Sequence, residues 1–225
     1  MSDSSIAPPP PPITKPQFSK LNTSLWILFT VAASVGVLQS ILTLARGAQY
    51  VNLDSGITPS KKDAAETMDN LIAAAIGLNM WIAVAIFVLL IVYTYRLVVK
   101  TRNAGFKVRM PNGLAIGAWF IPLANSILCL LFFVDIVKAN PSNRQRGLTL
   151  LNLWWWLFIA GTHSIFLFES LVDDAEYYLD AGYLSYVGAG MTFLAVASAF
   201  FAVLFFRQIR HFEATLDKPA NPPVI

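Results

Sequence analysis

Three ionisable residues lie in or beside long apolar stretches of this sequence: Asp135, His163 and Glu169. An ionisable side chain inside a membrane span is costly, so it usually faces a neighbouring helix or a wet cavity and can carry protons or ions. His163 lies near the middle of its apolar run, whereas Asp135 and Glu169 lie near the ends of theirs. The three residues form a candidate intramembrane polar site. A hydrogen bond to a neighbouring helix is the more ordinary role for His163.

The rest of the sequence holds no pattern that is typical of a catalytic or metal site. One cysteine and two histidines argue against disulfide, zinc and haem chemistry. A glycine-rich phosphate loop and the G-x-S-x-G and H-E-x-x-H motifs are missing from the sequence. We therefore expect a non-catalytic protein without cofactor or metal ion. Convergence of Asp135, His163 and Glu169 on one cavity would instead indicate a membrane-embedded enzyme.

The composition indicates a membrane protein. Hydrophobic types make up 56% of the 225 residues and charged types 13%, whereas soluble domains have about 45–50% and about 25%. The net charge of +3 could attract nucleic acid, but the basic residues flank apolar runs, where they orient membrane proteins. We expect an all-α integral membrane protein that contacts the lipid bilayer and does not bind nucleic acid.

Four apolar runs are long enough to cross the bilayer, since about 20 helical residues span ~30 Å of hydrocarbon. These runs cover residues 25–45, 71–99, 148–172 and 184–206. A helix start at Pro59, with acidic Asp63 and Glu66 in its early turns, should lead into the second run. The predicted organisation is a disordered proline-rich tail over residues 1–22, a helical membrane domain over residues 23–210 and a tail over residues 211–225.

A fifth apolar run, residues 117–137, contains Pro122 and Asn125 near its middle. Proline removes a backbone hydrogen bond and breaks or kinks a helix. The Asn125 side chain can bond to the backbone groups that the break exposes, which hydrocarbon cannot do. The segment can therefore cross the membrane as a kinked helix, or it can enter the membrane and return to the same face.

The distribution of Lys and Arg favours the second arrangement. If all five runs cross, the connecting segments carry seven basic residues on one side and nine on the other. If residues 117–137 return to the same face, the numbers become thirteen and three. Basic residues concentrate on the cytoplasmic side. We therefore expect four transmembrane helices and a re-entrant or membrane-buried segment, with five spans as the alternative. Both termini should be cytoplasmic and the location should be the plasma membrane.

One motif resembles a known family. The stretch "WFIPLAN", with Trp119, Pro122 and Asn125, precedes the tryptophan-rich "LWWWLFIAG". This pattern resembles a multi-pass membrane family found mainly in actinobacteria, domain of unknown function 4328, over roughly residues 71–206. In that family an amphipathic helix follows the Asn, whereas "SILCLLFF" here is far more apolar, which leaves a deeper hairpin or a true span open. The resemblance implies a fold and no reaction.

Small residues form a stripe on each terminal span. The stripe of the last span comprises Gly188, Thr192, Ala195, Ala199 and Ala202. The stripe of the first span comprises Ala32, Gly36, Ser40 and Thr43. Such stripes let helix backbones approach closely, either within one bundle or against another protein. The six tryptophans are expected to form an interfacial belt and packing contacts, because the three adjacent ones, 154–156, point in three directions.

These features favour a non-catalytic accessory or scaffolding subunit that associates with other membrane proteins, or with its own copies, through small-residue helix faces. The alternative is a small transporter or channel that uses Pro122, Asn125 and His163, because broken helices at membrane depth bind solutes and ions through their freed backbone ends.

Overall fold

The computed structural model describes residues 18–54, 56, 58–109, 111–120, 125–140, 143–173 and 177–216. Every element in these residues is helical, as the sequence predicts. The elements are α1 (Phe18–Asp54), α2 (Pro59–Asn103), α3 (Asn112–Gly117), the 3-10 turn η1 (Ala118–Phe120), the π-helical turn η2 (Asn125–Cys129), α5 (Leu130–Ala139), α6 (Arg144–Asp173) and α7 (Tyr178–Leu216). Within the described residues, α1, α2 and α7 are long and apolar enough to cross a membrane.

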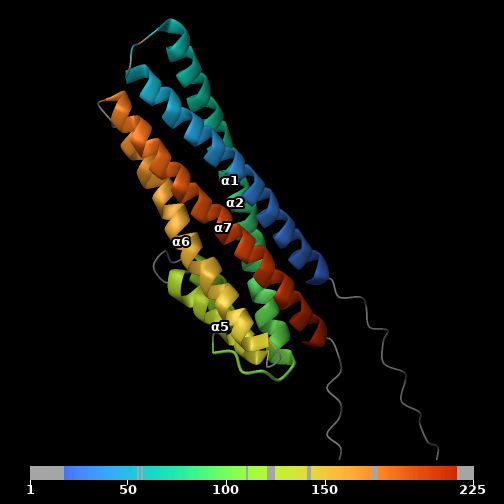
Figure 1. Ribbon diagram of the computed structural model, residues 1–225. Helices are drawn as coiled ribbons and strands as arrows, with labels where there is room; N and C mark the ends of the chain where they lie inside the picture. The colour runs from blue at the N-terminus through green and yellow to red at the C-terminus, as the bar shows by residue number, and fades with distance from the viewer. Residues whose placement is uncertain are drawn as a thin grey trace, which may run out of the picture.

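The long helices form an elongated bundle (Figure 1). Helix α7 lies between α1 and α6, and α2 packs on the other side of α1. Helix α1 begins where α7 ends, and α3 and α5 lie at this same end (Figure 1). We call it the basic end, because it carries most of the Lys and Arg residues. Two hydrogen bonds join elements there, from Lys100 Nζ of α2 to the Glu213 carbonyl of α7 and from Gln208 Nε2 to the Asn143 carbonyl.

Helix α2 begins at Pro59, as the sequence predicts. The Thr58 side chain caps it by accepting a hydrogen bond from the Lys61 amide, and proline fits the first helical position because no intrahelical partner awaits its missing N–H. The helix ends before Gly105, whose φ of +85° lies in the left-handed region that favours glycine. These signals set the bounds of a helix that otherwise has a nearly continuous apolar sequence.

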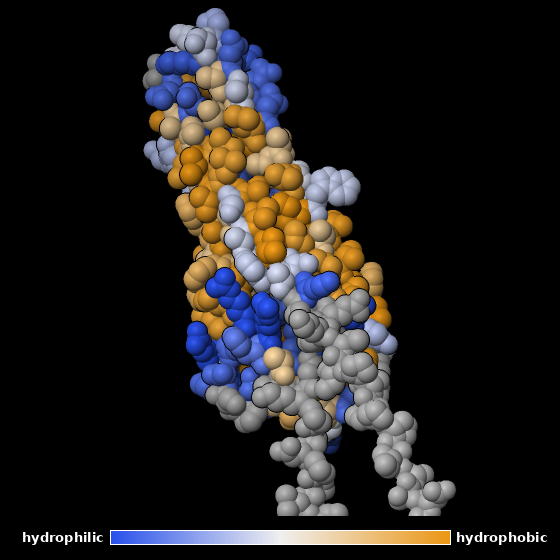
Figure 2. All heavy atoms as spheres, turned by 90° about the vertical axis from the view of Figure 1, so that its right-hand side faces the viewer, coloured by the Kyte–Doolittle hydropathy of each residue, from blue (hydrophilic) through white to orange (hydrophobic). Residues whose placement is uncertain are grey.

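The surface of the bundle fits a bilayer. Figure 2 shows hydrophobic surface along the middle of the molecule and hydrophilic surface gathered toward its two ends. The 37 residues of α1 extend over about 55 Å, whereas the hydrocarbon core is ~30 Å thick. Helix α1 is therefore longer than a bilayer crossing requires, and α1 and α7 continue past the predicted bounds 23–210 to Phe18 and Leu216. Residues 1–17 and 217–225 lie outside the described residues.

An aromatic core holds the basic half of the bundle together. Trp154 of α6 packs against Phe206 of α7, Phe133 of α5 and Phe29 of α1, with ring centroids 5.2, 5.6 and 5.9 Å apart. Phe133 is fully buried. This large apolar side chain packs α5 against α6 and α7, so the helix after "WFIPLAN" is part of the packed bundle.

The apolar run 117–137 is not one continuous α-helix in the described residues. Helix α3 ends at Gly117, η1 ends at Phe120, and helical structure resumes with η2 at Asn125. Pro122, the predicted cause of the break, lies in residues 121–124, outside the described residues. The change from α-helix to a 3-10 turn after Gly117 and the π-helical turn from Asn125 together interrupt the run.

Candidate functional site

The helix-break motif is described in part. The Trp119 ring is buried and meets Phe87 of α2 edge to face, with centroids 5.7 Å apart. Asn125 is the first residue of the π-helical turn η2, and its side chain, like all of Pro122, lies outside the described residues. A π-helical turn widens the helix by one residue and often occurs at functional sites. The motif therefore combines a tryptophan anchored on α2 with an irregular helix start.

Asp135 of α5 forms an ion pair with Arg109, the residue two positions before Pro111 and α3. The Arg109 Nη2 lies 2.7 Å from Asp135 Oδ1, and the Arg109 Nε and backbone amide also donate to this carboxylate. The hydrogen bonds and then the charge of Asp135 raise the pKa of Arg109. The ion pair joins the chain before α3 to the second half of α5.

His163 and Glu169 are part of α6, but their side chains lie outside the described residues. Val137 Cγ1 lies 2.7 Å from the position that a Cβ would take on Gly147 of α6. His163 follows Gly147 by sixteen residues, which is about 24 Å along a helix. Asp135, two residues before Val137, therefore lies nearer the level of Gly147 than that of His163, and the polar site of Asp135, His163 and Glu169 stays a prediction.

The small-residue stripe of α7 faces the inside of the bundle. Gly188, Thr192, Ala199 and Ala202 are buried, and Ala195 is half-buried. A Cβ on Gly161 of α6 would lie 2.7 Å from the Ala195 backbone nitrogen, so the two helix backbones nearly touch there. On α1, Gly36, Ser40 and Thr43 are buried as well, and Ala32 is half-buried. Both predicted stripes are thus used for packing between helices of this chain.

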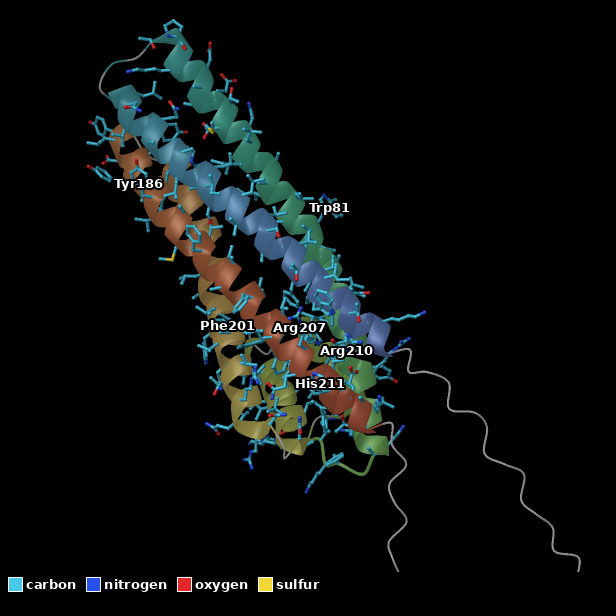
Figure 3. All side chains as sticks on the ribbon, turned by 45° about the vertical axis from the view of Figure 1, so that its right-hand side comes forward. Trp81, Tyr186, Phe201, Arg207, Arg210 and His211 are labelled. Carbon is cyan, nitrogen blue, oxygen red and sulfur yellow. The ribbon has the colours of Figure 1, made fainter. Side chains whose placement is uncertain are left out.

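The tryptophans divide between the core and the surface. Trp154 and Trp155 are buried, whereas 60% of Trp156 is exposed, so the three adjacent residues line no common pocket. Trp81 of α2 is 76% exposed and projects away from the bundle (Figure 3). It lies in the middle third of the apolar run 71–99, although tryptophan concentrates at the membrane interfaces. Trp81 is therefore not explained by an interfacial belt.

Helix α2 exposes one continuous face around this tryptophan. We call it the open face of α2; it comprises the half-buried Gly77 and the exposed Ala73, Trp81, Val84 and Val88. A Cβ on Gly77 would meet no atom within 4 Å. Only 17% of the apolar window of α2 is buried, against 28% for α1 and 39% for α7. Of the three helices compared, α2 thus leaves the largest share of its apolar window uncovered by the described residues.

The sequence analysis missed an amide pair between α1 and α2. Asn79 Nδ2 donates to Gln39 Oε1 over 3.0 Å, and Gln39 is 2% exposed. Both residues stand alone as amides in apolar runs. An isolated amide in an apolar run indicates a hydrogen bond to another helix, because polar side chains in membrane spans usually bond to a neighbouring helix.

A second missed cluster joins three helices at the end opposite to the basic end. Arg46 of α1 is 4% exposed, and its Nε donates to Ser185 Oγ of α7 over 3.2 Å. Its Nη1 lies 3.8 Å from Asp69 Oδ1 of α2. Tyr50 Oη also donates to Asp69. The cluster compensates a buried cation and fixes α2 to the outer end of α1.

A third cluster lies near the basic end. Asn22 of α1 is fully buried, and its Nδ2 donates to Tyr93 Oη of α2 and to the Phe206 carbonyl of α7, each over 3.0 Å. The sequence analysis assigned Asn22 to the N-terminal tail. In the structure it belongs to α1, and one amide nitrogen connects three helices.

In the part of the chain that the structure describes, no group of three or more His, Cys, Asp or Glu side chains could hold a metal ion. Many of the described polar groups instead act between helices, and the open face of α2 includes the 76% exposed Trp81. The arrangement is that of a packed bundle in which α2 and α6 lie on opposite sides of the α1 and α7 pair.

Comparison with known proteins gives one match. The family described as Domain of unknown function (DUF4328) matches residues 58–213, which is more than half of the 225 residues. No curated protein and no solved structure matches the chain. The matched region begins at the cap of α2 and ends in the last turn of α7. This chain belongs to the DUF4328 family.

Proposed function

We propose that this protein is a non-catalytic accessory or scaffolding subunit of the plasma membrane, and that it packs a transmembrane helix of another membrane protein against the open face of α2. The observation that carries this proposal is the pair formed by the half-buried Gly77, where an added Cβ would meet no atom within 4 Å, and Trp81, which is 76% exposed. A glycine inside a helix costs about 1 kcal/mol relative to alanine, and in membrane helices this cost is commonly offset by close approach of a second backbone.

The surroundings of Gly77 fit such a contact. Its neighbour one turn away, Ala73, is small and exposed, so a partner backbone could approach over two turns. One turn further, Trp81 offers a large ring at mid-span, and aromatic side chains are among the most frequent anchors of protein interfaces. Among the described helices, none covers Trp81, Val84 or Val88, which are all exposed. The small-residue stripes of α1 and α7 pack against other helices of the same bundle. The open face of α2 is therefore the surface that we assign to the partner.

For the membrane topology we propose four spanning helices, α1, α2, α6 and α7, and a re-entrant hairpin formed by α3 and α5, with both termini in the cytoplasm. The Arg109 and Asp135 ion pair supports the hairpin, because it joins the segments before α3 and at the end of α5. The ten residues from Asn125 to Asp135 extend over about 15 Å as a helix. This length is half the ~30 Å thickness of the hydrocarbon core.

The test compares two glycine substitutions of the same size. Gly77→Leu adds a side chain to the open face of α2, and Gly190→Leu adds one to an exposed position of α7; a Cβ at either glycine would meet no atom within 4 Å. Both variants should fold, since neither adds a clash. Affinity purification in mild detergent from the native host, with quantitative identification of membrane proteins, should lose the partner for Gly77→Leu and keep it for Gly190→Leu.

Trp81→Ala should act like Gly77→Leu in this experiment, because it removes the anchor and leaves the bundle untouched. Two differently tagged copies of the chain distinguish a second copy from a different protein as the occupant. The proposal fails if every membrane protein that co-purifies with the wild type is retained equally by Gly77→Leu, Trp81→Ala and Gly190→Leu.

The second candidate function is a small transporter or channel. The observation that favours it is the π-helical turn that starts at Asn125, after the break in residues 117–137. It requires that Asn125→Leu or His163→Leu reduces a solute or ion flux into liposomes while the purified protein stays folded. Absence of flux for the reconstituted wild type would remove this candidate.

A further inference from the structure

We propose that the last exposed turns of α7, together with Trp26 of α1, form a binding site for one anionic phospholipid at the basic end of the bundle. The site is independent of the open face of α2, because the residues that form it belong to α1 and α7. Its parts are a pair of arginines for the phosphate and an aromatic strip for an acyl chain.

The headgroup part of the site starts with Arg207. Its Cζ lies 5.2 Å from the centroid of the half-buried Trp26 ring, a cation–π distance. Stacking on the ring leaves the N–H groups at the rim of the guanidinium, where a phosphate can accept two parallel hydrogen bonds. Arg210 and His211 follow on the next turn of α7, and both are exposed (Figure 3). The two arginines thus place two positive charges one turn apart.

The acyl-chain part continues along the same face of α7. Phe193 and Phe200 precede Arg207 by fourteen and seven residues and are 46% and 57% exposed. Residues seven apart differ by only about 20° around a helix, so the three side chains share one face. The distance from Phe193 to Arg207 is about 21 Å. A lipid with its phosphate at Arg207 would therefore lay a chain over both phenylalanine rings.

The charge balance of the two ends shows why the lipid should be anionic. At the opposite end, Arg46 is paired with Asp69, and Lys61 Nζ donates to the Asn52 and Gly56 carbonyls. At the basic end, Arg144, Arg146, Arg207 and Arg210 are all exposed. Figure 2 shows hydrophilic side chains gathered beside hydrophobic surface toward this end. A concentration of cations beside the apolar surface attracts anionic headgroups in preference to zwitterionic ones.

The experiment measures the lipid retained by the full chain. The purified protein is exchanged into mild detergent with equal amounts of phosphatidylglycerol and phosphatidylcholine, and native mass spectrometry counts the bound lipids. The wild type should retain phosphatidylglycerol in excess. Arg210→Gln should reduce the retained phosphatidylglycerol about fivefold, which corresponds to the contribution of one basic residue to binding at an anionic lipid surface. The double variant Arg207→Gln/Arg210→Gln should abolish the excess of phosphatidylglycerol.

The matched control is Arg144→Gln with Arg146→Gln, which removes the same charge from exposed positions of α6 at the same end. This control should keep the excess of phosphatidylglycerol. An equal loss in both double variants would overturn the site, because it would mean that net charge alone attracts the lipid. Equal retention of the two lipids by the wild type would also overturn it.

Discussion

At the scale of single residues, three polar clusters bond helices to each other: Asn22 with Tyr93, Gln39 with Asn79, and Arg46 with Asp69. The hydrophobic effect gives no preference between a neighbouring helix and lipid, so such bonds and close packing must specify which helix faces pair. The clusters lie at different heights of α1. Together they fix the position of α2, the helix with the least burial, along its length.

Substitution of Asn22 should destabilise the bundle. Asn22→Leu removes two hydrogen bonds from a fully buried position and should lower the free energy of unfolding by about 1–2 kcal/mol. Asn152→Leu is the matched control, because Asn152 is exposed and its side chain bonds only to its own helix at the Leu148 carbonyl; it should stay within about 0.5 kcal/mol of the wild type. Unfolding in mixed detergent micelles measures the free energy of unfolding of both variants. Equal losses of stability would contradict the role of Asn22 in joining the helices.

The sequence predicts which of these polar side chains matter better than it predicts their partners. Gln39 and Asn79 can be recognised as isolated amides in apolar runs, but their pairing depends on the register between two helices, which no local pattern contains. Asp135 is visible as an acidic residue at the end of an apolar run, whereas its partner Arg109 is 26 positions away across the break. His163 and Glu169 remain predictions, because their side chains lie outside the described residues.

At the scale of elements, α1 and α7 approach each other closely at a pair of glycines. A Cβ on Gly47 would lie 2.8 Å from Tyr186 Cε1 and 3.0 Å from the Gly182 carbonyl oxygen. A Cβ on Gly182 would lie 3.1 Å from the Gly47 carbonyl oxygen. Since no side chain fits between the two backbones, these glycines set the distance between the terminal helices at the end opposite to the basic end.

Gly47→Leu should therefore separate α1 from α7. We expect a loss of about 1–3 kcal/mol in the free energy of unfolding, as for other insertions into packed interfaces. Gly190→Leu introduces the same side chain into open space on α7 and should be neutral or stabilising by up to about 1 kcal/mol, since leucine has the higher helix propensity. Thermal unfolding in detergent distinguishes the two, and a tolerated Gly47→Leu would show that the close approach is not required.

The elements themselves are largely encoded in local sequence. The helix start at Pro59 and the interruption in residues 117–137 are both visible as proline signals, and both are confirmed. The extension of α1 to Phe18 and of α7 to Leu216 is not visible from hydropathy. These turns are polar, and their helical form depends on the neighbouring helices beyond the hydrocarbon.

At the scale of the whole molecule, the proposed topology places the chain before α3 and the chain after α5 on the same side of the membrane. With Cys129→Ala as background, Asn103→Cys and Asn143→Cys introduce exposed thiols at the basic end, and Asn52→Cys introduces one at the opposite end. A membrane-impermeant maleimide should label 103 and 143 from the same side and 52 from the other side. Labelling of 103 and 143 from opposite sides would establish five spans.

The open face of α2 could not be predicted from the sequence, for a physical reason. Helix α2 is largely apolar on all sides over residues 71–99, so beyond the isolated Asn79 its sequence does not indicate which side packs. Only the positions of α1 and α3 show which residues remain uncovered. The same limit applies to the stripes of α1 and α7, whose spacing is equally suited to internal and external packing.

Photo-crosslinking in the native membrane tests the central claim most directly. p-Benzoylphenylalanine is introduced at Val88 on the open face of α2 or at Leu38 on α1, two apolar positions that are both 53% exposed. Irradiation of cells should give a crosslink to a second membrane polypeptide from Val88, absent with Gly77→Leu, and only lipid adducts from Leu38. Lipid adducts alone from both positions would contradict the proposal that α2 binds a partner.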